Sequence, residues 1–475
     1  MKKWLDKLLK RNPPSAVNIS TLGTSASIAR EAQNNPTQLR SGLQRSPPAG
    51  QKKTDQPLEA LQKLSPLNAT DINNLGSIPH KTLRYSTGAV IFLQGDLTDV
   101  AYYLFDGAVE LHPDTDDNFD LSIATPIHPI ASYTITANTV LATFPLNSGR
   151  LFGATAIAKS NVDIIIIPNE ILQLCLKPTP EPAGQLTLNT SILPQDFSKT
   201  EFFKSFAQAY HKNKLHLPSL PNVAIKLRNA MQGDISIREA VSIIQMDPAI
   251  VTKLIQVANS PLYAPTNSIK NCHDAITRLG LDATRNLVIG INLKQLFHCK
   301  NKQIMAQMQA TWRQSLLVSS LCFVLAEEVG SINPEEALLA GLINDIGIIP
   351  LLNFAETHLT EQSNLQQIID MLPYLRAPVG RMVLNSLDFS EELTEIPFEA
   401  ENWFYDSGEK IQLIDIVILA KLHSYMGTEK AKELPYINSI PAYAKLKNGK
   451  LSQDFSLAII HKAQQRINET MSILA

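Results

Sequence analysis

The chain has 475 residues, well beyond the roughly 250–300 residues that one hydrophobic core usually serves, so two or three domains are expected. Hydrophobic residues make up 44% of the sequence and charged residues 18%, a composition that excludes a wholly disordered chain. The 42 basic and 44 acidic residues give a net charge of −2, which argues against duplex nucleic acid as the main partner.

The sequence favours a cytoplasmic location. Its 4 cysteines are far apart and form no CxxC pair, which is typical of a reducing compartment and argues against a disulfide scaffold or a zinc ribbon. The first residues, MKKWLDKLLKR, lack the long apolar core and the small-residue cleavage site of a secretory signal. No uninterrupted apolar run of about 18 residues stands out, so no membrane-spanning helix is expected.

Residues 1–57 are predicted to form a short basic amphipathic helix followed by a disordered linker. Within residues 1–11, Trp4, Leu5 and Leu8 share one helical face, and basic residues mostly cover the rest. The polar, proline-containing sequence that follows cannot bury enough apolar area to offset the entropy cost of ordering. A weak contact of residues 1–11 with an anionic membrane surface is left open.

Residues 58–177 are predicted to form a β-rich domain. Short β-branched and aromatic runs alternate with turn signals, among them Gly88, Gly95 and Gly107, as in a small antiparallel barrel or sandwich. A helix opened by Pro168-Asn169-Glu170 follows the last strand. The proline-rich stretch after it predicts a stiff linker over residues 178–201.

Residues 202–475 are predicted to form an all-α domain that ends in C-terminal helices. Asp247 and Asn333 each precede a proline and should cap helices that begin there. We expect Gly280 to end one helix and Asp282 to cap the next, and Gly330 to end a long apolar helix. The later candidate helices are LQQIIDML, APVGRMVLNSL, KIQLIDIVILAKLHSYM and a C-terminal SLAIIHKAQQRINETM.

The helical half resembles the HDOD family, the HD-related output domains of bacterial signalling proteins, over a core of about residues 215–405. Five segments carry the resemblance: LPSLPNVAIKLRNAM (217–231), DPAIVTKLIQVANSPLY (247–263), DAITRLGLDATRNLV (274–288), ALLAGLINDIGIIPLL (337–352) and VGRMVLNSL (379–387). The resemblance implies an all-helical fold akin to that of HD phosphohydrolases, without their catalytic residues.

The residues at the metal-ligand positions support that loss. Where HD enzymes carry their His-Asp doublet, this chain has Asn344-Asp345, and Gln314 stands where a first ligand histidine is expected, after Trp312. A side-chain amide is a poor ligand for a transition metal, so Asp345 and Asp415 remain as two carboxylates without imidazoles. We therefore predict no catalytic residue and no metal, with these positions vestigial, and we read Asp345 as a polar residue that closes a helix.

The β-rich half looks like a cyclic nucleotide-binding domain, by TGAVIFLQGDLTDVAYYLFDGAVEL (87–111) and GATAIAKSNVDIIIIPNEIL (153–172). In that family a Gly-Glu pair and an arginine bind the ribose and the phosphate. Here no Gly-Glu occurs in the corresponding stretch, and Phe152 stands at the register of the arginine. Arg150, two residues earlier, is a weak candidate for a phosphate contact because an offset of two keeps a strand residue on the same face.

These observations favour a multidomain α+β protein of bacterial signal transduction that is not an enzyme. The degenerate β-barrel would be a sensor or assembly module, and the HDOD half would bind a protein partner, with no cofactor. A homodimer is left open. The alternatives are a genuine cyclic-nucleotide receptor that controls the HDOD domain and a divergent metal-dependent HD phosphohydrolase.

Overall fold

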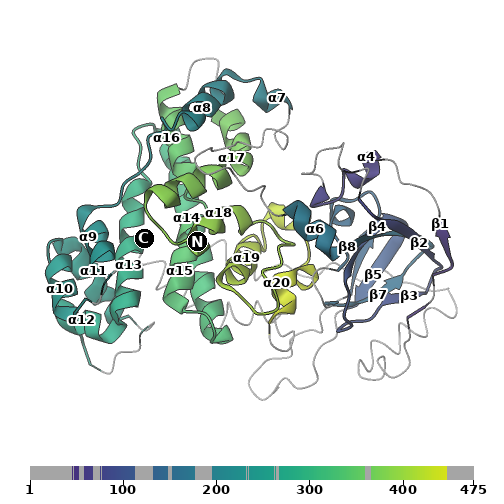
Figure 1. Ribbon diagram of the computed structural model, residues 1–475, viewed down its shortest axis with the longest axis horizontal. Helices are drawn as coiled ribbons and strands as arrows, with labels where there is room; N and C mark the ends of the chain where they lie inside the picture. Colours follow the sequence, from purple (N-terminus) through teal and green to yellow (C-terminus); the bar gives the residue numbers. More distant parts are fainter. Residues whose placement is uncertain are drawn as a thin grey trace. The chain divides into compact units, whose positions relative to one another are not determined.

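The computed structural model describes residues 45–46, 48–52, 58–67, 75, 78–112, 132–147, 152–176, 195–231, 233, 235–260, 263, 267–358 and 365–446. The chain divides into two compact units (Figure 1). The β unit comprises Met1–Ser65, Ser77–Ile171 and Tyr425–Ile440, and the helical unit comprises Pro66–Gly76, Leu172–Ser424 and Pro441–Ala475. The predicted helix at residues 1–11, most of both predicted linkers, Arg150 and the helices predicted after residue 446 lie outside the described residues.

The β unit contains two four-stranded antiparallel sheets. One has the strand order β1-β2-β8-β4 and the other β3-β7-β5-β6. The strands are β1 (Gly50–Lys52), β2 (Lys81–Tyr85), β3 (Val90–Phe92), β4 (Val100–Asp106), β5 (Ala108–His112), β6 (Tyr133–Thr136), β7 (Thr155–Ala158) and β8 (Val162–Pro168). The short helices described in the part of this unit before residue 171 are α4 (Leu58–Leu61) and η2 (Val140–Thr143). The described strands therefore make a sheet-rich domain of two sheets, in which no closed barrel is found.

The core of the β unit is aromatic at its centre. The rings of Phe92 and Phe152 stack with their centroids 4.1 Å apart, and the ring of Tyr102 meets both edge-on. Gly88, Gly95 and Gly107 all have positive φ angles, which confirms the turns predicted from these glycines.

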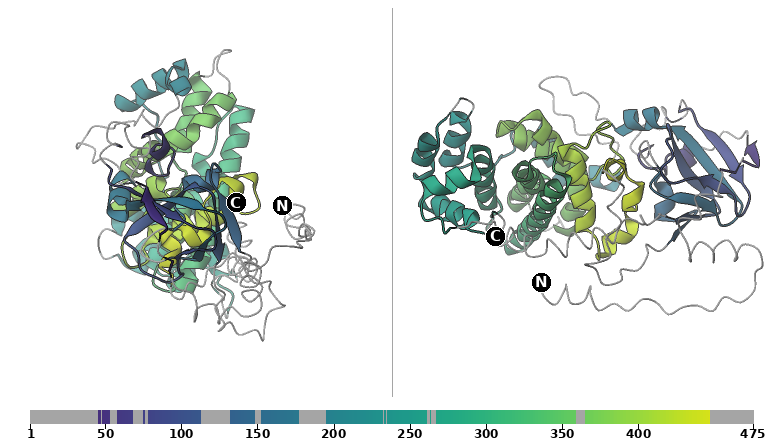
Figure 2. Two further views of the ribbon diagram at one scale, coloured as in Figure 1. Left: turned by 90° about the vertical axis from the view of Figure 1, so that its right-hand side faces the viewer. Right: turned by 90° about the horizontal axis from the view of Figure 1, so that it is seen from below.

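The helical unit is built from helices of very different lengths. They are α6 (Asn169–Leu176, at the boundary of the units), α7 (Gln195–Ser198), α8 (Glu201–His211), α9 (Asn222–Ala230), α10 (Ile237–Ile244), α11 (Pro248–Ala258), α12 (Cys272–Leu279), α13 (Leu281–Leu293), η5 (Lys294–Leu296), α14 (Lys302–Val329), α15 (Pro334–Ile343), α16 (Ile348–His358), α17 (Leu365–Ser386), α18 (Glu391–Glu399), α19 (Leu413–Ser424) and α20 (Pro441–Ala444). The long helix α14 packs along α15 and α19 in the middle of this unit (Figures 1 and 2).

The helix ends test the predicted caps. The side chains of Asp247 and Asn333 accept hydrogen bonds from backbone N–H groups in the first turns of α11 and α15, and Gly330 ends α14 in the left-handed conformation, as predicted. The cap predicted at Asp282 is wrong. Only Gly280, with a φ of 85°, separates α12 from α13, so this single residue serves both ends and Asp282 lies inside the first turn of α13.

One segment corrects the expectation that no part of the chain is apolar enough to span a membrane. The described residues contain one such segment by length and composition, Pro334–His358, with a mean hydropathy of 1.7 over its best window. Of that window, 89% is buried, as in the core helix of a folded domain. The apolar character of α15 and α16 is therefore accounted for by packing.

Candidate functional site

The candidate site lies where α15 ends. Asn344 follows the last residue of α15, and Asp345 lies in the turn that leads into α16. Gly347, in the same turn, allows α17 to approach closely, because a Cβ atom there would lie 1.9 Å from the backbone oxygen of Arg376. Only glycine fits this crossing without a shift of the backbone. The crossing brings the side chain of Arg376 to the carboxylate of Asp345.

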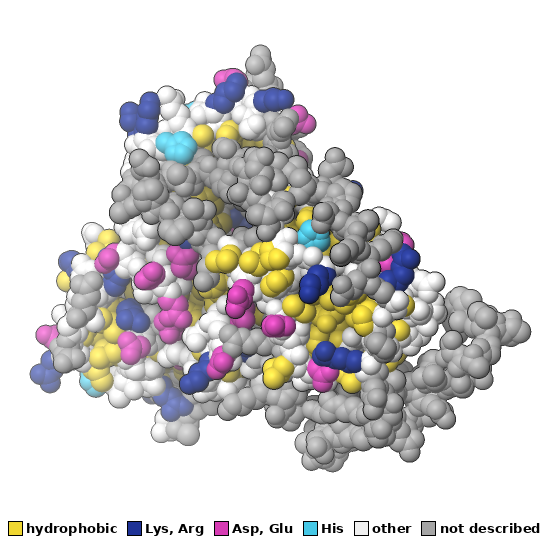
Figure 3. Space-filling model, turned by 45° about the vertical axis from the view of Figure 1, so that its right-hand side comes forward, with side chains coloured by type: hydrophobic (Ala, Val, Ile, Leu, Met, Phe, Trp, Pro, Cys, Tyr) yellow, Lys and Arg dark blue, Asp and Glu magenta, His cyan; other side chains and the backbone are white. Residues whose placement is uncertain are grey.

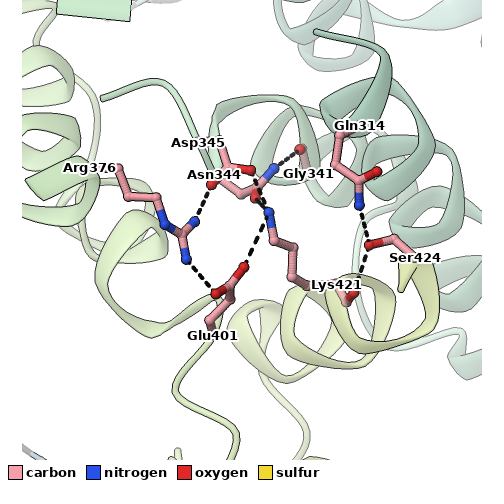
Figure 4. A network of polar contacts seen from close by, with 8 residues as sticks. All are labelled: Gln314, Gly341, Asn344, Asp345, Arg376, Glu401, Lys421 and Ser424. Carbon is pink, nitrogen blue, oxygen red and sulfur yellow. Dashed lines mark hydrogen bonds and ion pairs between the residues drawn. The ribbon is translucent and has the colours of Figure 1, made fainter. Parts of the chain in front are cut away.

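Four charged side chains form a buried cluster around Asp345 (Figure 4). Arg376 and Lys421 each donate a short hydrogen bond to the Asp345 carboxylate, one to either oxygen. Glu401 pairs with both cations: its Oε2 lies 2.7 Å from a terminal nitrogen of Arg376, and its Oε1 lies 3.7 Å from the Nζ atom of Lys421. Lys421 is only 1% exposed. Two carboxylates and two cations make the cluster formally neutral.

Asn344 belongs to the same cluster. Its Oδ1 atom accepts a hydrogen bond of 2.7 Å from the Nζ atom of Lys421, and its Nδ2 atom donates one of 2.7 Å to the backbone oxygen of Gly341. Gln314, on α14, donates a hydrogen bond of 2.7 Å to the hydroxyl of Ser424 at the end of α19. Both amides therefore have protein partners on α19, Asn344 at Lys421 and Gln314 at Ser424 (Figure 4).

The electrostatics of Asp345 follow from these neighbours. Burial acts to raise the pKa of its carboxyl group, but the charges of Lys421 and Arg376 oppose this effect and hold the pKa below its ordinary value. Asp345 is therefore ionised at neutral pH, as a member of a compensated buried ion pair. The interpretation of Asp345 as a residue that merely closes a helix was incomplete, because the carboxylate is the centre of the cluster.

Asp415 takes part in a separate cluster at the start of α19. It is completely buried and accepts hydrogen bonds from the hydroxyl of Ser407 at 2.6 Å and the backbone N–H of Gln412 at 2.7 Å. The Nζ atom of Lys445 lies 2.9 Å from Asp415 and 3.0 Å from Asp406. None of the hydrogen bonds and ion pairs found for Asp415 in the described part of the chain involves Asp345. The structure therefore does not bring the two predicted carboxylates together.

These residues do not fit a catalytic metal ion. The ammonium group of Lys421 already binds the oxygens of Asn344 and Asp345 that would face a metal, and a second cation there would be repelled. Across the described ranges, no group of three or more His, Cys, Asp or Glu side chains is placed to hold a metal. A hydrolytic metal needs several such ligands and an open position.

Three members of the cluster were missed in the sequence, namely Arg376, Glu401 and Lys421. Lys421 had a readable signal, because it lies inside the otherwise apolar run IVILAKL (416–422), and a lysine that cannot reach solvent needs a buried acidic partner. Arg376 and Glu401 gave no such signal, because neither residue stands out in the sequence as a charge inside an apolar run, as Lys421 does.

In the β unit, the residue that the sequence resemblance predicts to stand in place of a phosphate-binding arginine is part of the core. Phe152 is 2% exposed and lies in the aromatic stack with Phe92 and Tyr102. The guanidinium of Arg45 lies 5.3 Å from the centroid of the Phe152 ring and pairs with Asp96 at 3.0 Å. Arg150 lies outside the described residues, so its role as a phosphate contact stays a prediction.

Comparison with known proteins agrees with the helical half of this description. Residues 217–401 match the HDOD domain, so the chain contains an HDOD domain. The structure is similar to that of a putative metal-dependent phosphohydrolase from Shewanella amazonensis SB2B, with a TM-score of 0.50 and 23% identity, over 57% of this chain and 97% of that one. This likeness shows the fold.

Two further likenesses are partial. An uncharacterized protein from Treponema pallidum (strain Nichols) is 23% identical over 137 residues, so the match spans 28% of this chain and a quarter of that relative's length. A cyclic nucleotide-binding-like protein from Brucella abortus matches with a TM-score of 0.19 and 14% identity, over 26% of this chain and 97% of that one.

Proposed function

We propose that this chain is a non-enzymatic regulatory protein of bacterial signal transduction. The helical unit acts as a platform that binds a protein partner, and the β unit acts as a sensor or assembly module. One observation carries the proposal: the ammonium group of Lys421 occupies the place beside Asn344 and Asp345 where a metal enzyme would hold its cation. We place the protein in the cytoplasm, as the cysteine pattern led us to expect.

The chemistry of the cluster supports a structural role. A metal-bound water is activated because the metal has an open coordination position and lowers the pKa of that water. A lysine that is 1% exposed and hydrogen-bonded to two side-chain oxygens has neither property. The cluster therefore links the end of α15 to α17 and α19 through ion pairs. A protein partner would then bind to the outer surface of the helical unit.

The second candidate function is a divergent metal-dependent phosphohydrolase. It is favoured by the fold shared with the putative metal-dependent phosphohydrolase from Shewanella amazonensis. The donor set argues against it, because Gln314 and Asn344 present amides where imidazoles are needed.

For the β unit, we propose a degenerate barrel-like sensor or assembly module that does not take a cyclic mononucleotide. The position of the phosphate-binding arginine is occupied by Phe152, whose ring is part of the core.

On the face of the molecule in Figure 3, basic and acidic side chains are interspersed. This mixed surface supports a protein partner over a polyanion.

The first test is elemental analysis of the full chain purified without a chelator, together with hydrolysis assays on cyclic dinucleotides in Mn²⁺ or Mg²⁺. We expect no stoichiometric metal and no turnover. The matched variants are Asp345→Asn and Asp282→Asn, the latter carrying an exposed side chain. Stoichiometric iron, manganese or zinc, or turnover that is lost in Asp345→Asn and kept in Asp282→Asn, would establish the hydrolase instead.

The second test addresses the platform. Candidate partners from bacterial extracts are purified and titrated against the full chain by calorimetry. We expect saturable binding that is retained by Asp282→Asn and weakened by surface substitutions in the helical unit. If every purified candidate fails to bind while the hydrolysis assays stay negative, the platform proposal is wrong.

A further inference from the structure

A segment from the far end of the sequence completes the β unit. Residues Tyr425–Ile440, here called the strap, belong to the β unit, although the chain enters the strap from α19 and leaves it into α20, both in the helical unit. The strap contains the short helices η6 (Glu429–Glu433) and η7 (Ile437–Ser439). The strap is therefore a segment of the β unit that is covalently joined at both ends to helices of the helical unit.

The strap docks through an aromatic and a polar contact with β6. The rings of Tyr436 and Tyr133 stack with their centroids 3.7 Å apart, and the hydroxyl of Tyr133 donates a hydrogen bond of 2.7 Å to the Oδ1 atom of Asn438. Tyr436 also packs against the hydrophobic core of the β unit, and Ile437 beside it is buried. The strap is therefore held by specific contacts as well as by apolar burial.

Gly153, just before β7, forms the seat of the strap. A Cβ atom at this position would lie 1.8 Å from the backbone oxygen of Asn438, and its three nearest neighbours would all be atoms of Asn438. The φ angle of Gly153 is outside the left-handed region, so its backbone conformation does not itself require glycine. The absence of a side chain at this position serves the approach of the strap.

Both ends of the strap lie next to buried ion pairs of the helical unit. Immediately before the strap, the hydroxyl of Ser424 accepts the hydrogen bond from Gln314 and donates one of 2.7 Å to the backbone oxygen of Lys421. Immediately after α20, Lys445 pairs with Asp415. The strap is therefore covalently continuous with the last turn of α19, which contains Lys421, and with the first residue of α20.

We propose that the strap is a conformational coupling device. When Asn438 is seated at Gly153, the strap restrains the end of α19 and the start of α20. An event on this face of the β unit that unseats the strap loosens these helix ends and reaches the buried clusters around Asp345 and Asp415. The inference concerns how the two units communicate and holds whatever the helical unit binds.

The test is hydrogen–deuterium exchange on the full chain with Gly153→Ala. A methyl group at residue 153 must displace the backbone of Asn438, and overpacking of this kind shifts a local equilibrium by roughly tenfold to a hundredfold. We expect exchange faster by that factor in the strap and in residues 421–424 and 441–444. The matched control is Gly233→Ala, where the nearest atom to a new Cβ is 3.9 Å away.

A second variant keeps the test decisive if Gly153→Ala does not fold. Tyr133→Phe removes the hydrogen bond to Asn438 and keeps the aromatic stack, so exchange in the same segments should rise by roughly twofold to tenfold. Unchanged exchange of the strap in the folded variants would show that Gly153 and Tyr133 do not seat it. Faster exchange of the strap alone, with residues 421–424 and 441–444 as in the wild type, would overturn the coupling.

Discussion

Replacing Lys421 with methionine is the sharpest test of the buried cluster. Lys421→Met keeps the length of the side chain and removes its charge. Asp345 then retains Arg376 as its only cationic partner in the cluster, and the Oδ1 atom of Asn344 loses the donor that now lies 2.7 Å away. The variant thus creates an imbalance of charge in a site where Asp345 is 5% exposed.

The expected loss of stability follows from the cost of breaking a buried ion pair, which is about 3–5 kcal/mol when one partner is removed. For a domain of about 150–250 residues, each kcal/mol lowers the Tm by roughly 2–4 °C, so a fall of roughly 6–20 °C is expected. Arg376 stays within reach of Asp345 and should keep the loss toward the lower end of this range.

The loss should depend on pH in a defined direction. The native pKa of Asp345 is lowered, so its ionised form stabilises the wild type at every pH above the unfolded value of about 3.9, and this contribution is lost as the pH falls through the native value. In Lys421→Met, burial raises the pKa of Asp345 relative to the wild type. The difference in free energy of unfolding between the two proteins should therefore be largest at neutral pH and shrink below about pH 4.

The assay is urea unfolding of the full chain at neutral pH and at a pH below about 4, in which unfolding is monitored through a signal from the helical unit. The control is Lys204→Met, which removes an exposed partner of Glu201 on the same helix face and should change stability by at most about 0.5 kcal/mol. If Lys421→Met and Lys204→Met have the same urea midpoint at neutral pH, the cluster contributes no net stability, and the expected cost of breaking its ion pair is refuted.

Three other predictions concern single groups. Burial raises the pKa of Glu399 to about 7, against the opposing hydrogen bond from Asn402, so the native state loses stability as the pH rises from about 4 to 7. Glu399→Gln should therefore be more stable than the wild type by up to roughly 3 kcal/mol at pH 8 and equal to it near pH 4. Equal urea midpoints of the two proteins at pH 8 would contradict this prediction. Burial raises the pKa of the thiols of Cys272 and Cys322, so iodoacetamide at neutral pH should modify these two cysteines only after the protein unfolds. Peptide mass spectrometry measures this, and modification of Cys322 in the native protein would show that its thiol is not buried. Millimolar cyclic AMP or cyclic GMP should leave the Tm unchanged if, as we propose, Phe152 stands in place of a phosphate-binding arginine. A ligand at a hundred times its Kd would add about 2.7 kcal/mol, and an upward shift that disappears in Arg150→Ala would establish the receptor alternative.

Local chemistry was readable from the sequence. Asp247 and Asn333 cap their helices because a short acceptor before a proline can satisfy the first free N–H groups of a helix. Gly88, Gly95 and Gly107 mark turns because only glycine adopts positive φ without strain. These predictions need no knowledge of distant residues, and the structure confirms them.

Features that depend on tertiary packing were not readable. LQQIIDML and APVGRMVLNSL, taken as separate helices, form one helix, α17, with Pro373 and Pro378 inside it, because packing against α16 and α18 outweighs the cost of the two prolines. The cluster around Asp345 joins residues up to 77 positions apart. No local pattern pairs Asp345 with Lys421, although the lysine in an apolar helix signalled that some partner was needed.

The strap has a consequence for the order in which the protein is made. Tyr133 and Asn438 are 305 positions apart. At roughly 5–20 residues per second, a ribosome needs roughly 15 to 60 s to reach Asn438 after it has made Tyr133. During that interval the strands of the β unit emerge with Gly153 and the ring of Tyr133 uncovered, because their partner does not yet exist. Each newly made chain therefore passes through a period in which this surface is open to chaperones or to a neighbouring chain, and the surface closes only after Asn438 has been made.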